Sequence, residues 1–416
     1  MSGRLEPQPW MTAPATRRVF AALEARGGAG CARFVGGCVR NALLGRPVDD
    51  LDIATVLTPE EARAALEAAG VRVVPTGLDH GTVTAVADHQ PFEITTLRRD
   101  VETDGRRAVV AFTTDWGEDA ERRDFRLNAL YAAPDGTLFD PTGGGLEDAR
   151  AGRIVFVGDP ETRIREDYLR ILRFFRFYAW FGRGPPDAAG LEACRSLKDG
   201  LTRISAERVQ KELLKLLAAG DPRASVRLMS ATGVLAVVAP AAQDLDRLDA
   251  LVEIERGALG EADPELRLAA LLPSDPARAR AAAEALRLSN AQRDRLEAAA
   301  GTEPPLAADM GAPAMRRAIY RLGPQPFRDR LKLAWAADRS PGQAGAWRAL
   351  LEASDAWRAP VFPVGGADAM ELGAPRGPAV GRALREVEDW WVQADFPADE
   401  AAIRDRLAAA VRRGTA

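Results

Sequence analysis

Cysteine, histidine and long apolar runs are scarce in this 416-residue chain, and each scarcity excludes a class of protein. The three cysteines, Cys31, Cys38 and Cys194, are an odd and scattered set, which argues against a disulfide framework and favours a reducing cytoplasm. Only His80 and His89 are present, so a histidine-rich metal centre cannot be built. No apolar stretch is long enough to span a bilayer, and the N-terminal residues lack the apolar segment of a signal peptide. We therefore expect a cytoplasmic protein with no membrane partner.

Length and charge indicate a globular chain of several domains. A chain of this length exceeds a single core, and 47 % hydrophobic with 28 % charged residues is a globular composition. The net charge of −4 argues against indiscriminate binding of nucleic acid. Between Arg163 and Lys215, however, 12 Arg or Lys residues face 7 Asp or Glu residues. This local surplus predicts a surface for RNA phosphates, and the alternative is a solvated helical face.

A glycine pair followed by an arginine predicts a phosphate site near the N-terminus. The run FVGGCVRNALLGRPVDDLDIAT occupies residues 34–55. Gly36 and Gly37 lack a Cβ, so the backbone there can approach a bulky anion. Residues 39–44 are typical of a helix start, where free N–H groups favour phosphate. Arg40 can bind phosphate oxygens with two parallel hydrogen bonds.

An Asp-x-Asp pair in the same run predicts a metal site. Side chains alternate along a strand, so Asp50 and Asp52 project from one face. Paired carboxylates together with substrate phosphate are a usual way to bind Mg²⁺. Glu93 is a candidate third carboxylate, either as a metal ligand or as the base for an attacking hydroxyl. A turn and a solvated strand edge are the alternatives for each motif alone, but their close succession favours phosphoryl or nucleotidyl transfer.

A helix with a polar stripe predicts selection between nucleotide bases. Asp167, Arg170, Arg173 and Arg176 are spaced three apart, with apolar residues between them. A carboxylate only accepts hydrogen bonds and a guanidinium only donates them. An Asp–Arg pair therefore matches cytosine and adenine, which present an amine donor beside a ring-nitrogen acceptor, and rejects uracil and guanine. Each unmatched buried group costs about 1–3 kcal/mol. The alternative is an amphipathic core helix with an exposed ion pair.

Three motifs in this order resemble the class II tRNA nucleotidyltransferase and poly(A) polymerase family, a branch of the DNA polymerase β-like superfamily. Beside residues 34–55, the resemblance rests on RRDFRLNALY (residues 122–131) and EDYLRILRFFRF (residues 166–177). One departure is Asn41, where the family usually has Asp, at a position that looks structural. The resemblance implies a polymerase-β-like head, and Asp50 and Asp52 holding two Mg²⁺ ions with help from Glu93.

The resemblance also implies roles for the nucleotide-binding residues. Gly37 and Arg40 would grip the triphosphate, and Asp167 with Arg170 would read the base. Asp124 would accept hydrogen bonds from the ribose hydroxyls. The remaining positions would lie beside the nucleotide or steady its site: Arg123, Asn128, Arg173 and Arg176.

The predicted fold is α+β, with a mixed-sheet head and helices followed by an elongated all-α region. Helical spacing dominates from Pro160 onward. Residues 59–69 predict a helix capped by Thr58, residues 98–122 a mobile loop, and residues 122–131 a helix. Five strands are expected, at residues 32–35, 51–54, 71–74, 81–87 and 92–97. The expected parts are an N-terminal lead-in (1–30), a catalytic head (31–155), a helical neck with the base-reading motif (156–240), and a helical body and tail that bind tRNA (241–416).

These features together predict an enzyme that adds C, C and A to the 3′ end of tRNA from CTP and ATP, without an obligate protein partner. The closest rival is a poly(A) polymerase built from the same motifs, and a partial CC- or A-adding enzyme is a further alternative. Against the first rival, TGLDHGTVTA (residues 76–85) has the form found in CCA-adding relatives. A rival of another class is a helical RNA-binding protein whose head has lost catalysis. The intact carboxylates Asp50 and Asp52 argue against it.

Overall fold

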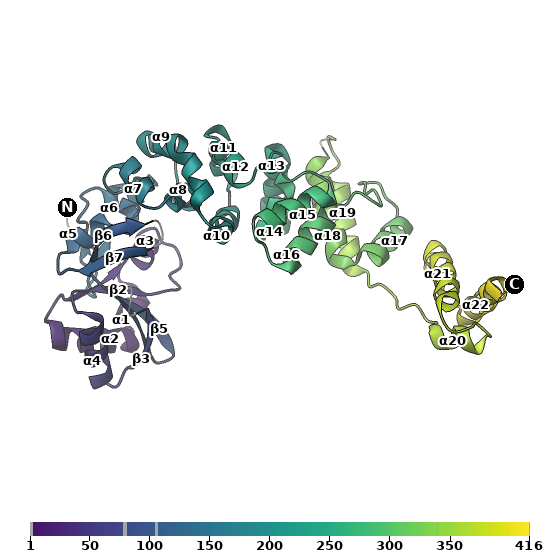
Figure 1. Cartoon of the computed structure of the whole chain (residues 1–416), viewed down its shortest axis with the longest axis horizontal. Coiled ribbons are helices and arrows are strands. Elements are labelled where there is room, and N and C mark those ends of the chain that lie inside the picture. The colour runs from purple at the N-terminus through teal and green to yellow at the C-terminus, as the bar shows by residue number, and fades with distance from the viewer. Residues whose placement is uncertain (1–2, 78–80, 105–106, 339, 416) are drawn as a thin grey trace. The chain divides into compact units, whose positions relative to one another are not determined.

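The computed structural model describes residues 3–77, 81–104, 107–338 and 340–415, so His80 lies outside the described residues. The chain divides into two compact units, Met1–Pro240 and Ala241–Ala416 (Figure 1). Within the described residues, no helix combines the length and the apolar character needed to cross a membrane. All three cysteines are buried and free.

The first unit is built on a mixed seven-stranded sheet with the strand order β3-β4-β5-β2-β1-β8-β9. Strands β2 and β5 are parallel neighbours, and the other neighbouring pairs are antiparallel. The five predicted strands occur as β1 to β5, with ends displaced by at most three residues, whereas β8 and β9 were not predicted. The bounds are β1 Ala32–Val35, β2 Asp52–Thr55, β3 Arg72–Gly77, β4 Thr82–Ala87, β5 Gln90–Thr96, β8 Tyr131–Ala132 and β9 Leu138–Phe139.

Short helices complete the head. Helices α2 and α4 pack against each other and against the sheet (Figure 1). The predicted start of α4 is confirmed: Thr58 caps the helix and Glu61 closes a capping box, which satisfies two backbone N–H groups. The bounds are α1 Pro9–Thr12, α2 Pro14–Gly27, α3 Gly37–Leu43, α4 Pro59–Ala68, α5 Trp116–Glu121 and α6 Gly145–Ala151.

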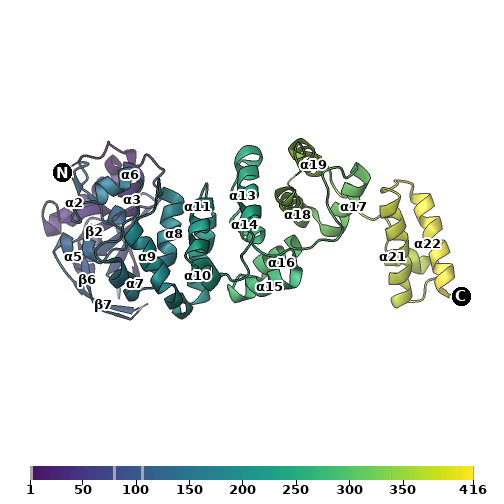
Figure 2. The ribbon, with the colours of Figure 1, turned by 90° about the horizontal axis from the view of Figure 1, so that it is seen from above.

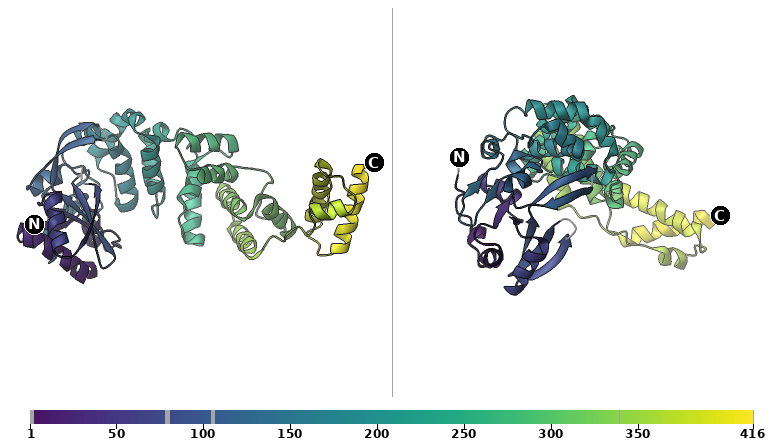
Figure 3. Two further views of the ribbon diagram at one scale, coloured as in Figure 1. Left: turned by 60° about the horizontal axis from the view of Figure 1, so that its bottom comes forward. Right: turned by 60° about the vertical axis from the view of Figure 1, so that its left-hand side comes forward.

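Residues 98–122 were predicted as a loop, but the described residues of this range form two strands and a helix, so the loop prediction was wrong for them. Strands β6 (Arg98–Asp104) and β7 (Arg107–Phe112) form a separate antiparallel hairpin, and α5 follows (Figure 3). The charge of the segment suggested a loop, but the run RAVVAF in β7 is apolar after its first residue and contains two β-branched valines, which favour a strand.

The rest of the first unit is helical. Helix α8 packs beside α10 and α11 (Figure 2). Its buried phenylalanines Phe174 and Phe177 meet Phe125 of the head, and Phe156 completes the aromatic cluster that joins the helices to the head. The bounds are α7 Pro160–Glu166, α8 Leu169–Phe181, α9 Ala188–Leu197, α10 Ala206–Leu217, α11 Arg223–Ala231 and α12 Val234–Val238.

The second unit contains helices only among its described elements, which confirms the predicted fold class. Helix α18 packs against α13, α16, α17 and α19. Another apolar cluster, centred on Trp391 and Leu407, joins α21 to α22. The bounds are α13 Leu245–Ile254, α14 Pro264–Leu271, α15 Pro276–Ala285, α16 Asn290–Ala299, α17 Ala312–Leu322, α18 Pro324–Ala337, α19 Ala344–Ala356, α20 Gly366–Glu371, α21 Pro378–Gln393 and α22 Glu400–Thr415.

Candidate active site

Three carboxylates meet at one pocket of the sheet. Because β2 and β5 run parallel in register, Asp52 lies directly beside Glu93, and Asp50 precedes the same strand. The pocket has a volume of about 590 Å³. Its lining residues are Val35, Asp50, Leu51, Asp52, Thr82, Thr84, Pro91, Glu93, Thr95, Arg98, Arg122 and Arg123. Three acidic and three basic side chains therefore surround a single space.

Repulsion between the three carboxylates is one cause of the raised pKa of Asp52. Burial first, and then the negative charges of Glu93 and Asp50, together raise the pKa of Asp52 to about 6. Within the described residues, no group of three or more His, Cys, Asp or Glu side chains is close enough to hold a metal by itself. Two carboxylates with excess negative charge still fit a divalent cation whose other ligands are phosphate oxygens and water.

The glycine pair lies at the entry to α3. Gly36 has a φ of 69°, in the left-handed region that favours glycine, and Gly37 is the first residue of the helix. Arg40 is not among the residues that line the carboxylate pocket. Its guanidinium lies 4.2 Å from the ring centre of Phe181 and donates to Asn41 and Asn128. Asn41 also donates to the Pro47 carbonyl, so its contacts hold the loop and Arg40.

The second motif is not the predicted helix. Only Arg126–Asn128 forms a single 3₁₀ turn, and Phe125 is extended and bridges to Phe156. The cause is Asp124, whose Oδ1 accepts the N–H of Phe125 at 2.9 Å and so competes with helical hydrogen bonding. The prediction of a helix over residues 122–131 was therefore wrong.

Asp124 is the centre of a buried polar network. Asn128 donates to its Oδ1 at 3.0 Å, and Arg173 donates to its Oδ2 through Nε at 2.7 Å and through Nη2. Arg40 donates to Asn128 at 2.6 Å. Burial raises the pKa of Asp124, but the Arg173 charge and these donors outweigh it and hold the pKa at about 2. The network thus joins the helix after the glycine pair to the third motif.

The third motif lies across a break between two helices, so the predicted single stripe was wrong. Helix α7 ends at Glu166, and Asp167 is extended with a φ of −152°. Its Oδ1 accepts the N–H of Leu169 at 3.1 Å, at the start of α8. Asp167 is paired with Arg208 at 2.7 Å, whereas Arg170 is paired with Glu166. The two proposed base-reading side chains thus have separate partners in this structure.

Helix α10 supplies two charged residues that sequence reasoning missed. Arg208 pairs with Asp167, and one turn later the buried Glu212 lies 2.8 Å from Arg176 and 4.0 Å from Arg173. Their spacing of four residues is the only signal in the sequence, and ordinary surface ion pairs show the same spacing.

Sequence reasoning also missed the contacts of Arg163, on α7, because its spacing of three residues from Glu166 is that of an ordinary surface ion pair. It donates to the Arg123 carbonyl at 3.0 Å and also contacts Glu166. It therefore links the second motif to the start of the third.

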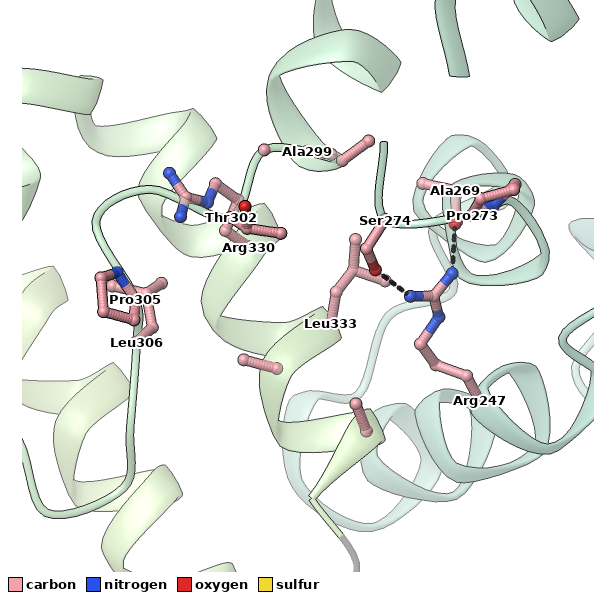
Figure 4. A pocket seen from close by; sticks show the side chains of 14 residues that line it. Arg247, Ala269, Pro273, Ser274, Ala299, Thr302, Pro305, Leu306, Arg330 and Leu333 are labelled. Carbon is pink, nitrogen blue, oxygen red and sulfur yellow. Dashed lines mark hydrogen bonds between the residues drawn. The ribbon is translucent and has the colours of Figure 1, made fainter. Parts of the chain in front are cut away.

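A second pocket lies among the helices of the second unit, and its lining contains arginines but no acidic side chains (Figure 4). Arg247 donates to Ser274 and to backbone carbonyls at the end of α14, and Arg330 donates to the carbonyls of Glu303 and Pro304. These guanidinium groups hold loops in place, and no carboxylate lines the pocket.

Two family descriptions match parts of the chain. Residues 32–155 match the poly A polymerase head domain. Residues 187–245, which include α10, match a segment described as a probable RNA and SrmB-binding site of polymerase A.

Relatives with assigned activities align with the chain as well. The mitochondrial CCA tRNA nucleotidyltransferase 1 of Danio rerio is 35 % identical over 378 residues, which cover 88 % of this chain and 84 % of that protein. The Homo sapiens protein of the same name is 44 % identical over 224 residues, covering 52 % of this chain and 51 % of that protein. The CCA-adding enzyme of Streptococcus pyogenes is 43 % identical over 202 residues, covering 48 % and 49 %. These last two alignments span about half of each relative.

Solved structures share the fold. The Bacillus stearothermophilus CCA-adding enzyme, in complex with CTP, matches with a TM-score of 0.77 and 29 % identity over 97 % of this chain and 99 % of that one. The Thermotoga maritima CCA-adding enzyme, complexed with tRNA, has a TM-score of 0.68 at 20 % identity over 96 % of each chain, a likeness of fold.

Proposed function

The chain belongs to the family of CCA-adding tRNA nucleotidyltransferases, and we propose that it adds C, C and A in turn to the 3′ end of tRNA from CTP and ATP. It is an enzyme that transfers nucleotides, as its relatives are. The observation that carries the proposal is the single pocket in which Asp50, Asp52 and Glu93 face three arginines.

The proposed reaction is attack of the tRNA 3′-hydroxyl on the α-phosphate of the bound nucleotide, with pyrophosphate as the leaving group. The hydroxyl must lose a proton, and we assign its acceptance to Glu93, a role supported by the position of Glu93 beside Asp52. The negative charge that moves to the leaving phosphates is matched by Arg122 and Arg123, which line the same pocket.

The family uses divalent metal ions, and we propose Mg²⁺ for this chain, held by Asp50 and Asp52. Support comes from the raised pKa of Asp52, because carboxylates crowded in this way are stabilised by a cation between them. When bound, Mg²⁺ lowers the pKa of a coordinated hydroxyl and neutralises phosphate charge. Below pH 6, protonation of Asp52 would weaken this site.

Base selection is assigned to Asp167 and Arg170 on the hydrogen-bonding argument, since a carboxylate and a guanidinium match the pairing edges of C and A. Ion pairs with Arg208 and Glu166 support the assignment, because they orient both side chains before a base arrives.

We also propose a division of labour along the chain. Residues 1–30 lead into the head at 31–155. The neck at 156–240 carries the base-reading motif, and the body and tail at 241–416 hold the tRNA. The RNA-binding description matched by residues 187–245 supports the assignment of RNA contacts to the neck.

Three free, buried cysteines support a reducing location, the cytoplasm. Cell fractionation that finds the protein in an oxidising compartment would contradict this location.

The deciding experiment incubates the full chain with tRNA that lacks its 3′ CCA, and sequences the products. We expect two C residues with CTP alone and CCA with both nucleotides. Poly(A) polymerase is the second candidate because the head matches that family description. Long A-tracts on generic RNA would establish it and refute CCA addition, and a stop after CC with both nucleotides would indicate a partial enzyme.

A further inference from the structure

A buried carboxylate behind the active-site pocket binds the arginines that line it. Asp119, on α5, has only 1 % of its side chain exposed and is not among the lining residues. It accepts hydrogen bonds from Arg122 Nε at 2.8 Å and from Arg123 Nη2 at 2.9 Å. Both arginines belong to the pocket lining. Asp119 is therefore one layer removed from the space in which the nucleotide reacts.

Asp119 remains an anion throughout the physiological pH range. Burial raises the pKa of its carboxyl group, but the charges of Arg123 and Arg122 outweigh that effect and hold the pKa at about 2. One negative charge is thus shared by two guanidinium groups. Each guanidinium has five N–H donors in a rigid fork, so donors that Asp119 does not use remain for an anion in the pocket.

Two further contacts fix the carboxylate itself. The Tyr131 hydroxyl donates to Asp119 Oδ2 at 2.7 Å, and the Tyr131 ring is held edge-on by Trp116. The backbone N–H of Arg98 donates to Oδ1 at 3.3 Å. Arg98 is the first residue of the β6–β7 hairpin and lines the same pocket. Asp119 therefore contacts each of the three residues that bring positive charge to the pocket.

We propose that Asp119 is a positioning residue that presents Arg98, Arg122 and Arg123 to the triphosphate of the incoming nucleotide. The inference rests on the proposed function, because it deepens the role of the same pocket. Asp119 does not touch the nucleotide and acts only through these residues. Since CTP and ATP share the triphosphate, its effect is the same for both, in contrast to the base-dependent effect expected of Asp167.

The test compares Asp119→Asn with Glu121→Gln, an exposed residue of the same helix, in the full chain. An asparagine keeps the shape but cannot balance two guanidinium charges. We expect the KM for CTP and for ATP to rise by a common factor of about 10–100, as for loss of a hydrogen bond between charged groups. The inhibition constant of pyrophosphate, which has no base, rises with them. The preference for CTP over UTP and the affinity for tRNA stay at the values of Glu121→Gln.

A second variant decides the matter if Asp119→Asn does not fold. Tyr131→Phe removes one donor to Asp119 and keeps the buried ring, so we expect a smaller rise of about 2–5-fold in the same constants. Unchanged pyrophosphate inhibition in the folded variants, or unequal factors for CTP and ATP, overturns the proposal. Calorimetry of CTP and pyrophosphate binding without tRNA separates this result from a failure of CCA addition, because it needs no transfer.

Discussion

Replacing Asp52 by asparagine tests whether the ionised Asp52 carboxylate destabilises the folded protein. Asp52 has a pKa of about 6 because it is buried and lies beside Glu93 and Asp50. The aspartate of an unfolded chain titrates near pH 3.9, so ionising Asp52 costs the folded protein about 3 kcal/mol at most. An amide of the same shape avoids that cost. In the absence of metal, Asp52→Asn is therefore expected to be more stable than the natural chain, while losing activity.

The difference in stability between Asp52→Asn and the natural chain should depend on pH. Between about pH 4 and pH 6 the folded state holds a proton on Asp52 that the unfolded state has released, so this group's contribution to stability falls as the pH rises. Above pH 6 the loss is complete. The stability gained by Asp52→Asn should thus be close to zero at pH 4, increase up to pH 6, and reach about 1–3 kcal/mol at pH 8.

Urea unfolding in EDTA at several pH values measures this difference, with Asp49→Asn as the control because Asp49 is an exposed neighbour. Adding Mg²⁺ and CTP should stabilise the natural chain more than the variant, since ligand that binds only the folded state shifts the equilibrium. A variant that is equally stable or less stable at pH 8 in EDTA would show that burial and the neighbouring carboxylates do not raise the pKa of Asp52 as the structure indicates.

Further substitutions test the assigned roles. Asp50→Ala or Asp52→Ala should abolish transfer and leave tRNA affinity within a few-fold in a gel-shift assay; retained turnover refutes the metal assignment. Arg170→Ala should weaken discrimination against UTP more than it weakens tRNA binding, and unchanged discrimination in competition assays refutes the base-reading role. Glu212→Gln removes the carboxylate beside Arg173 and Arg176, so the KM for CTP should rise about tenfold, as for a lost charged contact. Glu207→Gln, on the exposed face of the same helix, is its control, and equal KM values for the two variants would exclude the role of Glu212.

Local patterns predicted the elements whose side chains depend on near neighbours. The strands expected at residues 51–54 and 92–97 occur as β2 and β5, although Asp50 lies before β2 rather than within it. The capping signal at Thr58 located the start of α4 to the residue, because the cap and its partner Glu61 are three positions apart. Such contacts join residues that are close in the sequence, so a local sequence pattern is enough to predict them.

Two other features were mispredicted or missed partly because of contacts that are distant in the chain. The expected helix over the second motif is lost because the Asp124 carboxylate binds the neighbouring N–H and Arg173, 49 residues away. Arg208 reaches Asp167 across 41 residues. A charged residue on a helix has the same sequence signature whether it faces solvent or a partner, so the pattern alone does not identify these pairs.

The saturation of Asp124 has a consequence for how a sugar is recognised. A carboxylate offers about four acceptor positions, and Phe125, Asn128 and two nitrogens of Arg173 already occupy them. A ribose hydroxyl can therefore bind there only by displacing a resident donor, and Arg173 has a second carboxylate, Glu212, at 4.0 Å to which its guanidinium can turn. Binding of the sugar and release of that arginine would then be coupled, because the ribose hydroxyl would take the place of hydrogen bonds that Arg173 now donates to Asp124.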